Sequence, residues 1–367
     1  MARKLKSDKL LFLAVLLLVC CSVVMVYSAS ALIAMEQHGQ AYYFLFKQVT
    51  WVLLGLCLLL VAMRVDYRNL QQPVVLWTAL GISVLALVAV FFFGPEINGT
   101  RRWFAIGGVG VQPSELAKIA VIVFTADNLA RRMNRIDDVS YSLLPIAIVA
   151  GAVAGLVGME PDFGTALTIL MVVGMMVFTA GLGYRYLVGL VLTLTPLLYV
   201  VLASEPYRRQ RLVSFLDPWA DPLGSGFQII QSLIAVGTGG VVGQGIMGGA
   251  QKMFFLPEPF TDFIYAVIAE ETGLIGATLI LLCFCVITWR GLRIAARAPD
   301  QFGALLAVGL TTMVALQAFF NISVVLSLVP TKGIPLPFVS NGGSSMLVSL
   351  LAMGMLLNIS QHASAQR

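Results

Sequence analysis

Long apolar stretches follow one another along almost the whole chain. Ten of them approach the roughly 20 residues that an α-helix needs to cross the hydrocarbon core of a bilayer. They lie near 10–32, 46–63, 74–93, 113–130, 142–158, 164–181, 186–203, 262–289, 303–328 and 343–360. Only 11% of the 367 residues are charged, against roughly 25% in an ordinary soluble domain. The sequence therefore predicts an all-α, polytopic membrane protein with about ten transmembrane helices.

The basic residues predict how this bundle is oriented. Ten spans place both chain ends on one side of the membrane, and that side carries fourteen of the 23 Lys and Arg residues. Cytoplasmic segments are enriched in Lys and Arg, so we expect cytoplasmic N- and C-termini. The first apolar run is too long for a signal-peptide core, which indicates a retained first helix.

One connecting segment, 204–261, is much longer than the others and is rich in Gly, Pro and aromatic residues. Connections of that length are usually functional or disordered, and this composition favours a folded extracytoplasmic cap over the bundle. We expect residues 1–367 to form a single transmembrane domain that contains this loop.

Several function classes are disfavoured by the residues present. The two histidines, His38 and His362, lie far apart, and the five cysteines stand inside apolar stretches without metal-ligand spacing, so histidine catalysis and zinc binding are not expected. The net charge of +5 is typical of cytoplasmic loops and indicates no nucleic-acid partner. The glycine-rich run 237–249 has no preceding strand, and no Walker lysine motif is present. We expect these glycines to allow tight turns or the close approach of a ligand.

Asp262 is the strongest candidate for chemistry. It ends the long loop in the motif Leu256-Pro257-Glu258-Pro259-Phe260-Thr261-Asp262-Phe263. The two prolines hold Glu258 in an extended segment. The dipole of the following helix favours a charged Asp262, while partial desolvation raises its pKa. Asp262 is therefore either a general base for a substrate hydroxyl at the membrane surface or an ordinary acidic residue at a helix start.

Other ionisable residues stand at membrane depth or at the same edge, where they are costly unless paired or functional. Lys118 follows Glu115 by three residues on one predicted helix, so the two could form a local ion pair; Lys118 then serves either to anchor the helix or to face an anionic ligand. Asp162 precedes another apolar stretch and is suited to capping that helix.

Two further segments carry polar groups. Lys332 and Ser344 flank a Gly- and Ser-rich turn before the last span, which is either a re-entrant loop or a helix N-terminus that binds an anion. The adjacent acids Glu270 and Glu271 lie deeper in a span and point to different faces. At least one must meet a partner, such as Lys118 or an arginine, or stay protonated.

Taken together, these segments resemble the SEDS family (shape, elongation, division and sporulation proteins), whose members are ten-helix glycosyltransferases that polymerise peptidoglycan. The resemblance spans nearly the whole chain, in order, and is carried by the motifs Asn98-Gly99-Thr100-Arg101-Arg102-Trp103, Gln112-Pro113-Ser114-Glu115, Glu160-Pro161-Asp162-Phe163-Gly164-Thr165, the Asp262 motif above, and Gly333-Ile334-Pro335-Leu336-Pro337-Phe338. Thr331-Lys332 before Gly333 is more similar to the division branch, FtsW, than to the elongation branch, RodA. Phe260 and Asn341 depart from the family pattern, which has His and Tyr there.

The resemblance implies a substrate, partners and roles for particular residues. The substrate is lipid II, which is joined to the nascent glycan strand, and Asp262 is the catalytic base by motif. Substrate-binding roles are implied for Arg101, Arg102, Lys118, Glu258, Lys332 and Ser344, and supporting roles for Glu115, Asp162 and Glu270. A divalent cation, Mg²⁺ or Mn²⁺, could assist at the diphosphate, although no cofactor is required by the motifs. The partners would be a class B penicillin-binding protein and the divisome, at the bacterial cytoplasmic membrane.

Three alternatives remain open at this point. The chain could move lipid II across the membrane, it could be an elongation polymerase of the RodA type, or it could act mainly as a divisome scaffold. A polymerase needs the Asp262 carboxylate at the outer surface, whereas a flippase needs polar groups along the full depth of the bundle. Glu270 and Glu271 keep the second alternative open.

Overall fold

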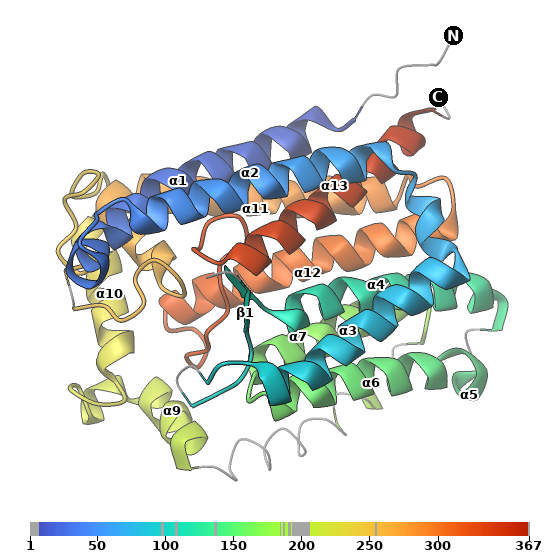
Figure 1. Ribbon diagram of the computed structural model, residues 1–367, viewed down its shortest axis with the longest axis horizontal. Coiled ribbons are helices and arrows are strands. Elements are labelled where there is room, and N and C mark those ends of the chain that lie inside the picture. The colour runs from blue at the N-terminus through green and yellow to red at the C-terminus, as the bar shows by residue number, and fades with distance from the viewer. Residues whose placement is uncertain are drawn as a thin grey trace.

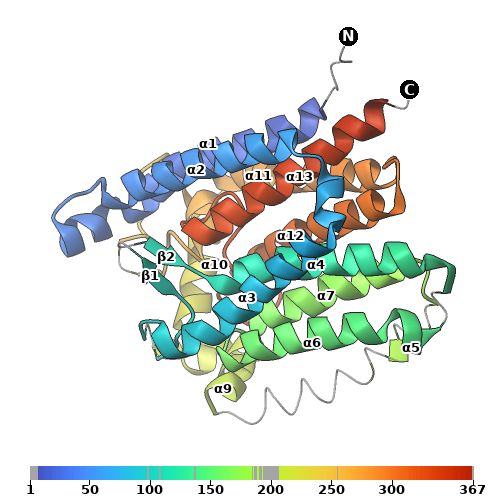
Figure 2. The same ribbon diagram turned by 45° about the vertical axis from the view of Figure 1, so that its right-hand side comes forward.

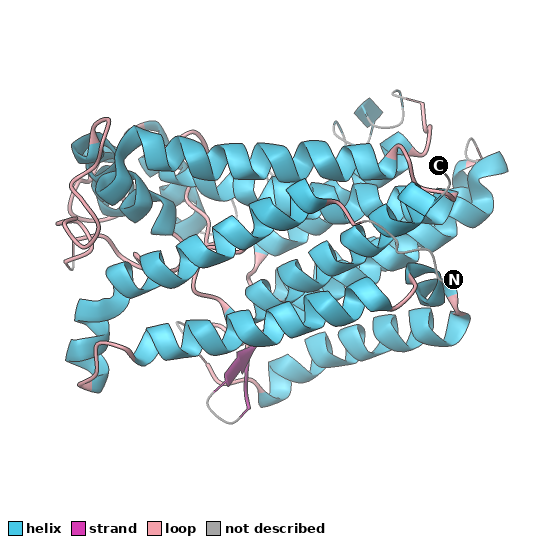
Figure 3. Ribbon diagram, turned by 90° about the horizontal axis from the view of Figure 1, so that it is seen from above, coloured by secondary structure: helices cyan, strands magenta, loops and turns pink. Residues whose placement is uncertain are grey.

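The computed structural model describes residues 7–96, 99–106, 109–135, 138–183, 185, 188–189, 192, 206–253 and 255–365. Helices dominate this part of the chain (Figure 3). The principal helices are α1 (Lys9–His38), α2 (Tyr43–Arg64), α3 (Pro73–Phe93), α4 (Pro113–Arg132), α6 (Leu144–Met159), α7 (Phe163–Thr179), α11 (Ile264–Ala295), α12 (Gln301–Val325) and α13 (Gly343–Ala365).

Shorter elements connect these helices. They are η1 (Tyr67–Gln71), β1 (Phe104–Ile106), β2 (Val109–Val111), η2 (Met133–Arg135), α5 (Val139–Ser142), α9 (Pro206–Leu216), η3 (Pro218–Ala220) and α10 (Phe227–Gly239). β1 and β2 form an antiparallel hairpin in which Phe104 pairs with Val111 and Ile106 with Val109. The long segment 204–261, which we expected to form a folded cap, contains α9, η3 and α10 in its described part.

Nine of the ten predicted spans coincide with these helices in the described ranges, which confirms the all-α membrane fold. The remaining one, 186–203, lies almost wholly outside the described residues. Six helices, α1, α2, α3, α11, α12 and α13, are long and apolar enough to cross a membrane by length and composition. α4 carries more charge, including Glu115, Lys118 and Asp127, and is buried along most of its length. Neighbouring helices therefore shield the charges of α4 from lipid.

The helices form layers around α4 and α12. α12 contacts α4, α7 and α11, while α1 packs on α11 and α13 packs on α2. α3 and α6 cover the opposite side of the bundle (Figures 1 and 2). Large apolar side chains project outward from the covering helices, for example Trp77 and Phe92 of α3 and Leu53 of α2. This distribution is that of a bundle whose outer surface faces lipid.

The two ends of the bundle differ in composition. We call the end that holds both described chain ends the terminal end, and the opposite one, with α9, α10 and the β-hairpin, the loop end (Figure 1). At the terminal end, Arg290 Nε donates to Asp8 Oδ2 at 2.8 Å, and the Asp8 amide donates to Ser360 Oγ at 3.2 Å. α1, α11 and α13 are therefore joined there by polar contacts.

α11 is interrupted at Gly273, where φ is +66° and ψ is −166°. The segment after α10 supplies the hydrogen bonds that the helix lacks at this break. Leu274 N donates to Gly240 O at 2.9 Å, and Gln244 N donates to Glu270 O at 3.0 Å. A Cβ at Gly243 would lie 2.2 Å from Glu271 O, so glycine is needed here for close approach to a helix backbone rather than to a ligand.

Candidate active site

Asp262 lies at the loop end, one residue before the N-cap of α11. The preceding turn is held by its own backbone, because Thr261 N and Phe263 N both donate to Glu258 O at 3.3 Å. Glu258 adopts φ +52°, so the proline-flanked residue is in the left-handed region rather than extended as predicted. The extended prediction failed because this backbone must turn to bring two amides onto one carbonyl.

Asn321 of α12 fixes the position of Asp262. Its Nδ2 donates to Asp262 O at 2.7 Å and to Ile334 O at 2.8 Å. The loop 330–342 is joined to the same turn by Ser340, whose Oγ donates to Thr261 O at 2.6 Å. Two segments about 70 residues apart in the chain are thus held against each other, and Gly333 is brought beside the Asp262 side chain.

The Asp262 carboxylate is half-buried and accepts no hydrogen bond from the described residues. Burial, together with the negative charge of Glu258, raises the pKa of Asp262 to about 7, against an opposing effect of Arg211. A carboxyl group with a pKa near neutrality and open lone pairs has the properties of a general base.

Two cationic side chains, Arg102 and Arg211, lie near enough to act on the charge of this carboxylate, and Lys332 lies in the neighbouring loop. Arg211 of α9 donates from Nη1 to Thr331 O at 3.3 Å, so α9 is joined to the loop that carries Lys332. Arg102 donates from Nε to Glu160 O at 2.7 Å and from Nη2 to Pro161 O at 2.9 Å. Lys332 is half-buried, and burial lowers its pKa while Asp162 opposes the change. The site therefore combines one open carboxylate with positive charge suited to an anionic group.

Asp162 caps α7, as its position in the sequence predicts. Its Oδ1 accepts from Thr165 N at 3.1 Å, and its Oδ2 accepts from Gln112 Nε2 at 3.2 Å. Ser344 is also engaged, since its Oγ accepts from Gln112 N at 3.0 Å and donates to Gly110 O at 3.2 Å. Both side chains thus connect the β-hairpin and α4 to neighbouring helices, and the predicted substrate-binding role of Ser344 stays a prediction.

The remaining predicted residues are dispersed. Lys118 Nζ donates to Glu115 Oε1 at 2.8 Å, and both side chains are buried, so the ion pair predicted from their spacing is present. Arg101 is exposed and lies beside Glu96, 3.8 Å away, on the side facing the end of α3. Glu270 accepts backbone hydrogen bonds from Ala250 and Gln251, and its supporting role stays a prediction.

The sequence analysis assigned no role in the site to Arg211, Gln112 or Asn321. Arg211 is one of several basic residues in the long loop. Nothing in the sequence indicates that α9 contacts the loop 330–342. Asn321 lies in an apolar span, and a buried amide at membrane depth was the signal that could have identified it. Phe260 and Asn341, the two departures from the family pattern, contact each other: Asn341 N donates to Phe260 O at 2.9 Å.

No three His, Cys, Asp or Glu side chains among the described residues lie close enough to hold a metal ion. Mg²⁺ commonly binds through one or two carboxylates and the phosphates of a substrate, so the predicted cation stays a prediction that depends on the substrate.

Known proteins match the chain over almost its full length. The family model described as "Cell cycle protein", which covers FtsW, RodA and SpoVE, matches residues 8–365. The chain belongs to this family, the SEDS family. This SEDS chain is 43% identical to a probable peptidoglycan glycosyltransferase FtsW of Geobacter metallireducens, with 97% of this chain and 95% of that protein covered. It is 41% identical to stage V sporulation protein E of Bacillus subtilis, with 98% and 99% covered.

Solved structures agree with this assignment. A chain of a peptidoglycan synthase complex matches with a TM-score of 0.81 at 32% identity, covering 98% of this chain and 99% of that chain. The rod shape determining protein RodA of Thermus thermophilus matches with a TM-score of 0.72 at 27% identity, with 97% of each chain covered. The SEDS chain is thus an integral protein of the bacterial inner membrane.

Proposed function

We propose that this SEDS protein is a peptidoglycan glycosyltransferase that polymerises lipid II into glycan strands, for septal wall synthesis in cell division. The loop end of the bundle lies at the outer face of the cytoplasmic membrane, and both termini are cytoplasmic. Residues 1–367 act as one membrane domain with 204–261 as its extracytoplasmic loop. The observation that carries the proposal is the open, half-buried Asp262 carboxylate, on which the positive charges of Arg102 and Arg211 act, beside the loop that carries Lys332.

We assign a step of the proposed reaction to each of these groups. Asp262 takes the proton of the acceptor sugar's 4-hydroxyl while that oxygen attacks the anomeric carbon of the growing strand. A carbon–oxygen bond forms, and the bond from the anomeric carbon to the lipid diphosphate breaks. The diphosphate leaves with the bonding electron pair, and the cations stabilise its negative charge. The activated donor drives the reaction, so no nucleotide is consumed.

The contacts of the buried charges favour a polymerase over a flippase. Glu270 and Glu271 had kept the transport alternative open, but both carboxylates are occupied by the loop segment 247–252 and by α1. The Lys118 ammonium group is likewise paired with Glu115. Charged groups that neutralise one another at depth do not offer a polar path to a moving headgroup.

The relatives support a proposal about the partner of this chain. Two relatives bear the names FtsW and stage V sporulation protein E, and a structural relative comes from a synthase complex. We propose a class B penicillin-binding protein as the transpeptidase partner within the divisome. Exposed apolar residues on the outer side of α11, among them Leu274, Leu279 and Trp289, are suited to contact its membrane span.

The direct test is polymerisation of lipid II by the purified protein with its transpeptidase partner. We expect Asp262→Asn to reduce glycan polymer at least about 100-fold, since general bases contribute roughly 10²–10⁴-fold. Asp217→Asn is the matched control, because Asp217 is an exposed carboxylate of the same loop that caps η3. Its rate should equal that of the wild type.

The pH dependence gives an independent check. Asp262 must be ionised to accept a proton, so the wild-type rate should rise as pH increases through about 7. Polymer formation by Asp262→Asn at the wild-type rate would refute the mechanism. Movement of lipid II across vesicle membranes without polymer formation would favour the flippase. The absence of both activities would favour the scaffold.

A further inference from the structure

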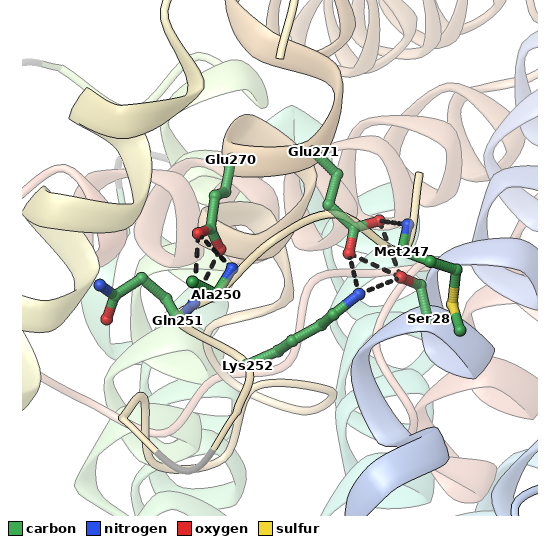
Figure 4. Close-up of polar contacts among 7 residues, drawn as sticks. All are labelled: Ser28, Met247, Ala250, Gln251, Lys252, Glu270 and Glu271. Atoms are coloured by element: carbon green, nitrogen blue, oxygen red, sulfur yellow. Dashed lines mark hydrogen bonds and ion pairs between the residues drawn. The ribbon is translucent and has the colours of Figure 1, made fainter. Parts of the chain in front are cut away.

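A buried polar cluster joins the long loop to two helices below the candidate site (Figure 4). Lys252 Nζ lies 2.5 Å from Glu271 Oε1 and donates to Ser28 Oγ at 2.9 Å. Ser28 of α1 donates to the Glu271 carboxylate at 2.6 Å, and Met247 N donates to Glu271 Oε2 at 3.1 Å. The Lys252 and Glu271 side chains are 3% and 0% exposed, so neither charged group is solvated by bulk water.

Glu270 completes the cluster on the neighbouring face of α11. Its Oε1 accepts from Ala250 N at 2.8 Å and from Gln251 N at 3.1 Å. A Cβ at Gly249 would lie 2.7 Å from Glu270 Oε2, so the loop backbone runs directly against this carboxylate. The two adjacent acids therefore bind one stretch of the loop: Glu270 binds the amides of 250–251, and Glu271 binds Met247 and Lys252 on either side of them, as Figure 4 shows.

The cluster joins the two ends of the segment that carries Asp262. Lys252 and Glu271 are the two ends of the segment that carries Glu258 and Asp262, and their ion pair closes that segment at its base. Beyond the base, the segment is held by Asn321 and Ser340. Breaking one partner of a buried ion pair leaves an uncompensated charge and is strongly destabilising locally, so opening this base would release the Asp262 segment.

We propose, resting on the polymerase activity proposed above, that Ser28, Lys252, Glu270 and Glu271 are positioning residues for polymerisation. By closing the base of the segment 255–269, these four residues, which we call the base clamp, hold the Asp262 carboxylate beside Gly333. They act through Asp262 and do not touch the reacting atoms. A displacement of about 1 Å at a reacting group can reduce a rate 100-fold, so a small opening of the clamp is sufficient to affect catalysis.

The test combines the rate of polymerisation with hydrogen–deuterium exchange of the full-length protein. We expect Lys252→Met to lower the rate at saturating lipid II at least about tenfold and to accelerate amide exchange in 255–263 by a similar factor. Glu271→Gln should act in the same direction. The double variant should lose less than the product of the two single losses, because it removes both buried charges.

The pH profile separates positioning from a loss of folded protein. An opened segment admits water to Asp262, so the inflection near pH 7 should move to lower pH in Lys252→Met. Fewer folded molecules would instead scale the rate equally at every pH. Should Lys252→Met fail to fold, Ser28→Ala is the milder variant, which removes only the hydroxyl from the cluster and should show the same changes at smaller size.

Arg290→Met is the matched control, since Arg290 forms an ion pair with Asp8 at the other end of α11. It should leave exchange in 255–263 and the pH inflection unchanged. A wild-type rate for Lys252→Met, or a lowered rate with unchanged exchange, would overturn the proposal. If the wild type makes no polymer, the polymerase proposal fails, whereas an unchanged exchange rate in Lys252→Met would show separately that the clamp does not hold the segment.

Discussion

Gly333 lies so close to Asp262 that even one added methyl group would displace the carboxylate. A Cβ at this position would lie 2.8 Å from Asp262 Oδ2, closer than side-chain carbons come to such atoms, so the carboxylate would have to move away. We expect Gly333→Ala to lower the polymerisation rate by about 10–100-fold with little change in melting temperature. The rate is measured with lipid II and the stability by thermal unfolding in detergent.

Gly342→Ala is a suitable control in the same loop. Its Cβ would meet only the Cβ of Ser345, at the ordinary contact distance of 3.6 Å. The rate of this variant should match the wild type. Equal rates for Gly333→Ala and Gly342→Ala would show that the Asp262 carboxylate is not confined as the structure has it.

Glu160 is a buried acidic residue near the candidate site. It is 1% exposed, and neither carboxylate oxygen has a hydrogen-bond partner among the described residues. Burial, with the nearby charge of Asp162, raises the pKa of Glu160 from 4.5 to about 8, although Arg102 opposes the change. The group is therefore held mainly in its neutral form at pH 7, which accounts for a buried carboxyl without donors.

Replacement by Gln should stabilise the protein in a pH-dependent way. The unfolded chain releases the Glu160 proton above about pH 4.5, whereas the folded chain keeps it up to about pH 8. Wild-type stability consequently falls as pH rises through this window. The melting temperature of Glu160→Gln, relative to the wild type, should increase from pH 4.5 to pH 8 and then level off. A difference that is constant with pH would contradict the raised pKa.

At the scale of elements, the apolar stretches were sufficient to predict most helices, because a span of about 20 apolar residues has few alternatives in a membrane. α4 was predicted as well, although its charges exclude it from the helices that are apolar enough by composition. The apolar stretch near 113–130 carried that prediction. The sequence could not show that α4 is central, since burial depends on the packing of α3, α7 and α12 around it.

The break in α11 could not be predicted from the sequence. A single glycine inside an apolar span is compatible with a straight helix, and only the segment 240–245 bonded across the gap gives Gly273 its conformation. The partner of Glu271 was missed for the same reason. Lys118 or an arginine was considered, but Lys252 forms the pair, because the loop returns to α11 instead of covering the bundle from outside.

Gly273→Ala should therefore destabilise the protein. The φ of +66° is strained for any residue with a side chain, at a cost of about 1–3 kcal/mol. In addition, the new Cβ would lie 2.4 Å from Gly243 N, and backbone cannot move aside as a side chain can. We expect a clear fall in melting temperature, measured in detergent.

Gly174→Ala in α7 is the matched control, because nothing lies within 4 Å of its Cβ position. An alanine there should raise stability by about 0.5–1 kcal/mol, as helix propensity predicts. If both variants had the same melting temperature, the break at Gly273 would not be a fixed feature of α11.

At the scale of the whole molecule, the polar groups divide between the two ends. The loop end holds Asp262 with Arg102, Arg211 and Lys332, and the terminal end holds Asp8, Arg290 and Asp300 with their partners. The sequence could predict that the candidate site lies at the end of the bundle opposite the chain termini, because ten spans place both termini on one side. It could not predict which cations of the loop end meet, since Arg101 and Arg102 are adjacent in the chain yet face different neighbours.

The contact between Asp8 and Ser360 at the terminal end has a consequence for covalent topology. The first and last described helices meet there, so the path of the chain through the membrane is nearly a closed ring. A flexible linker of about ten residues has a root-mean-square reach of roughly 17 Å, and such a linker could join the two helix ends without displacing either. The two helix ends could therefore be linked, and the chain opened at another connection, without changing the arrangement of the helices.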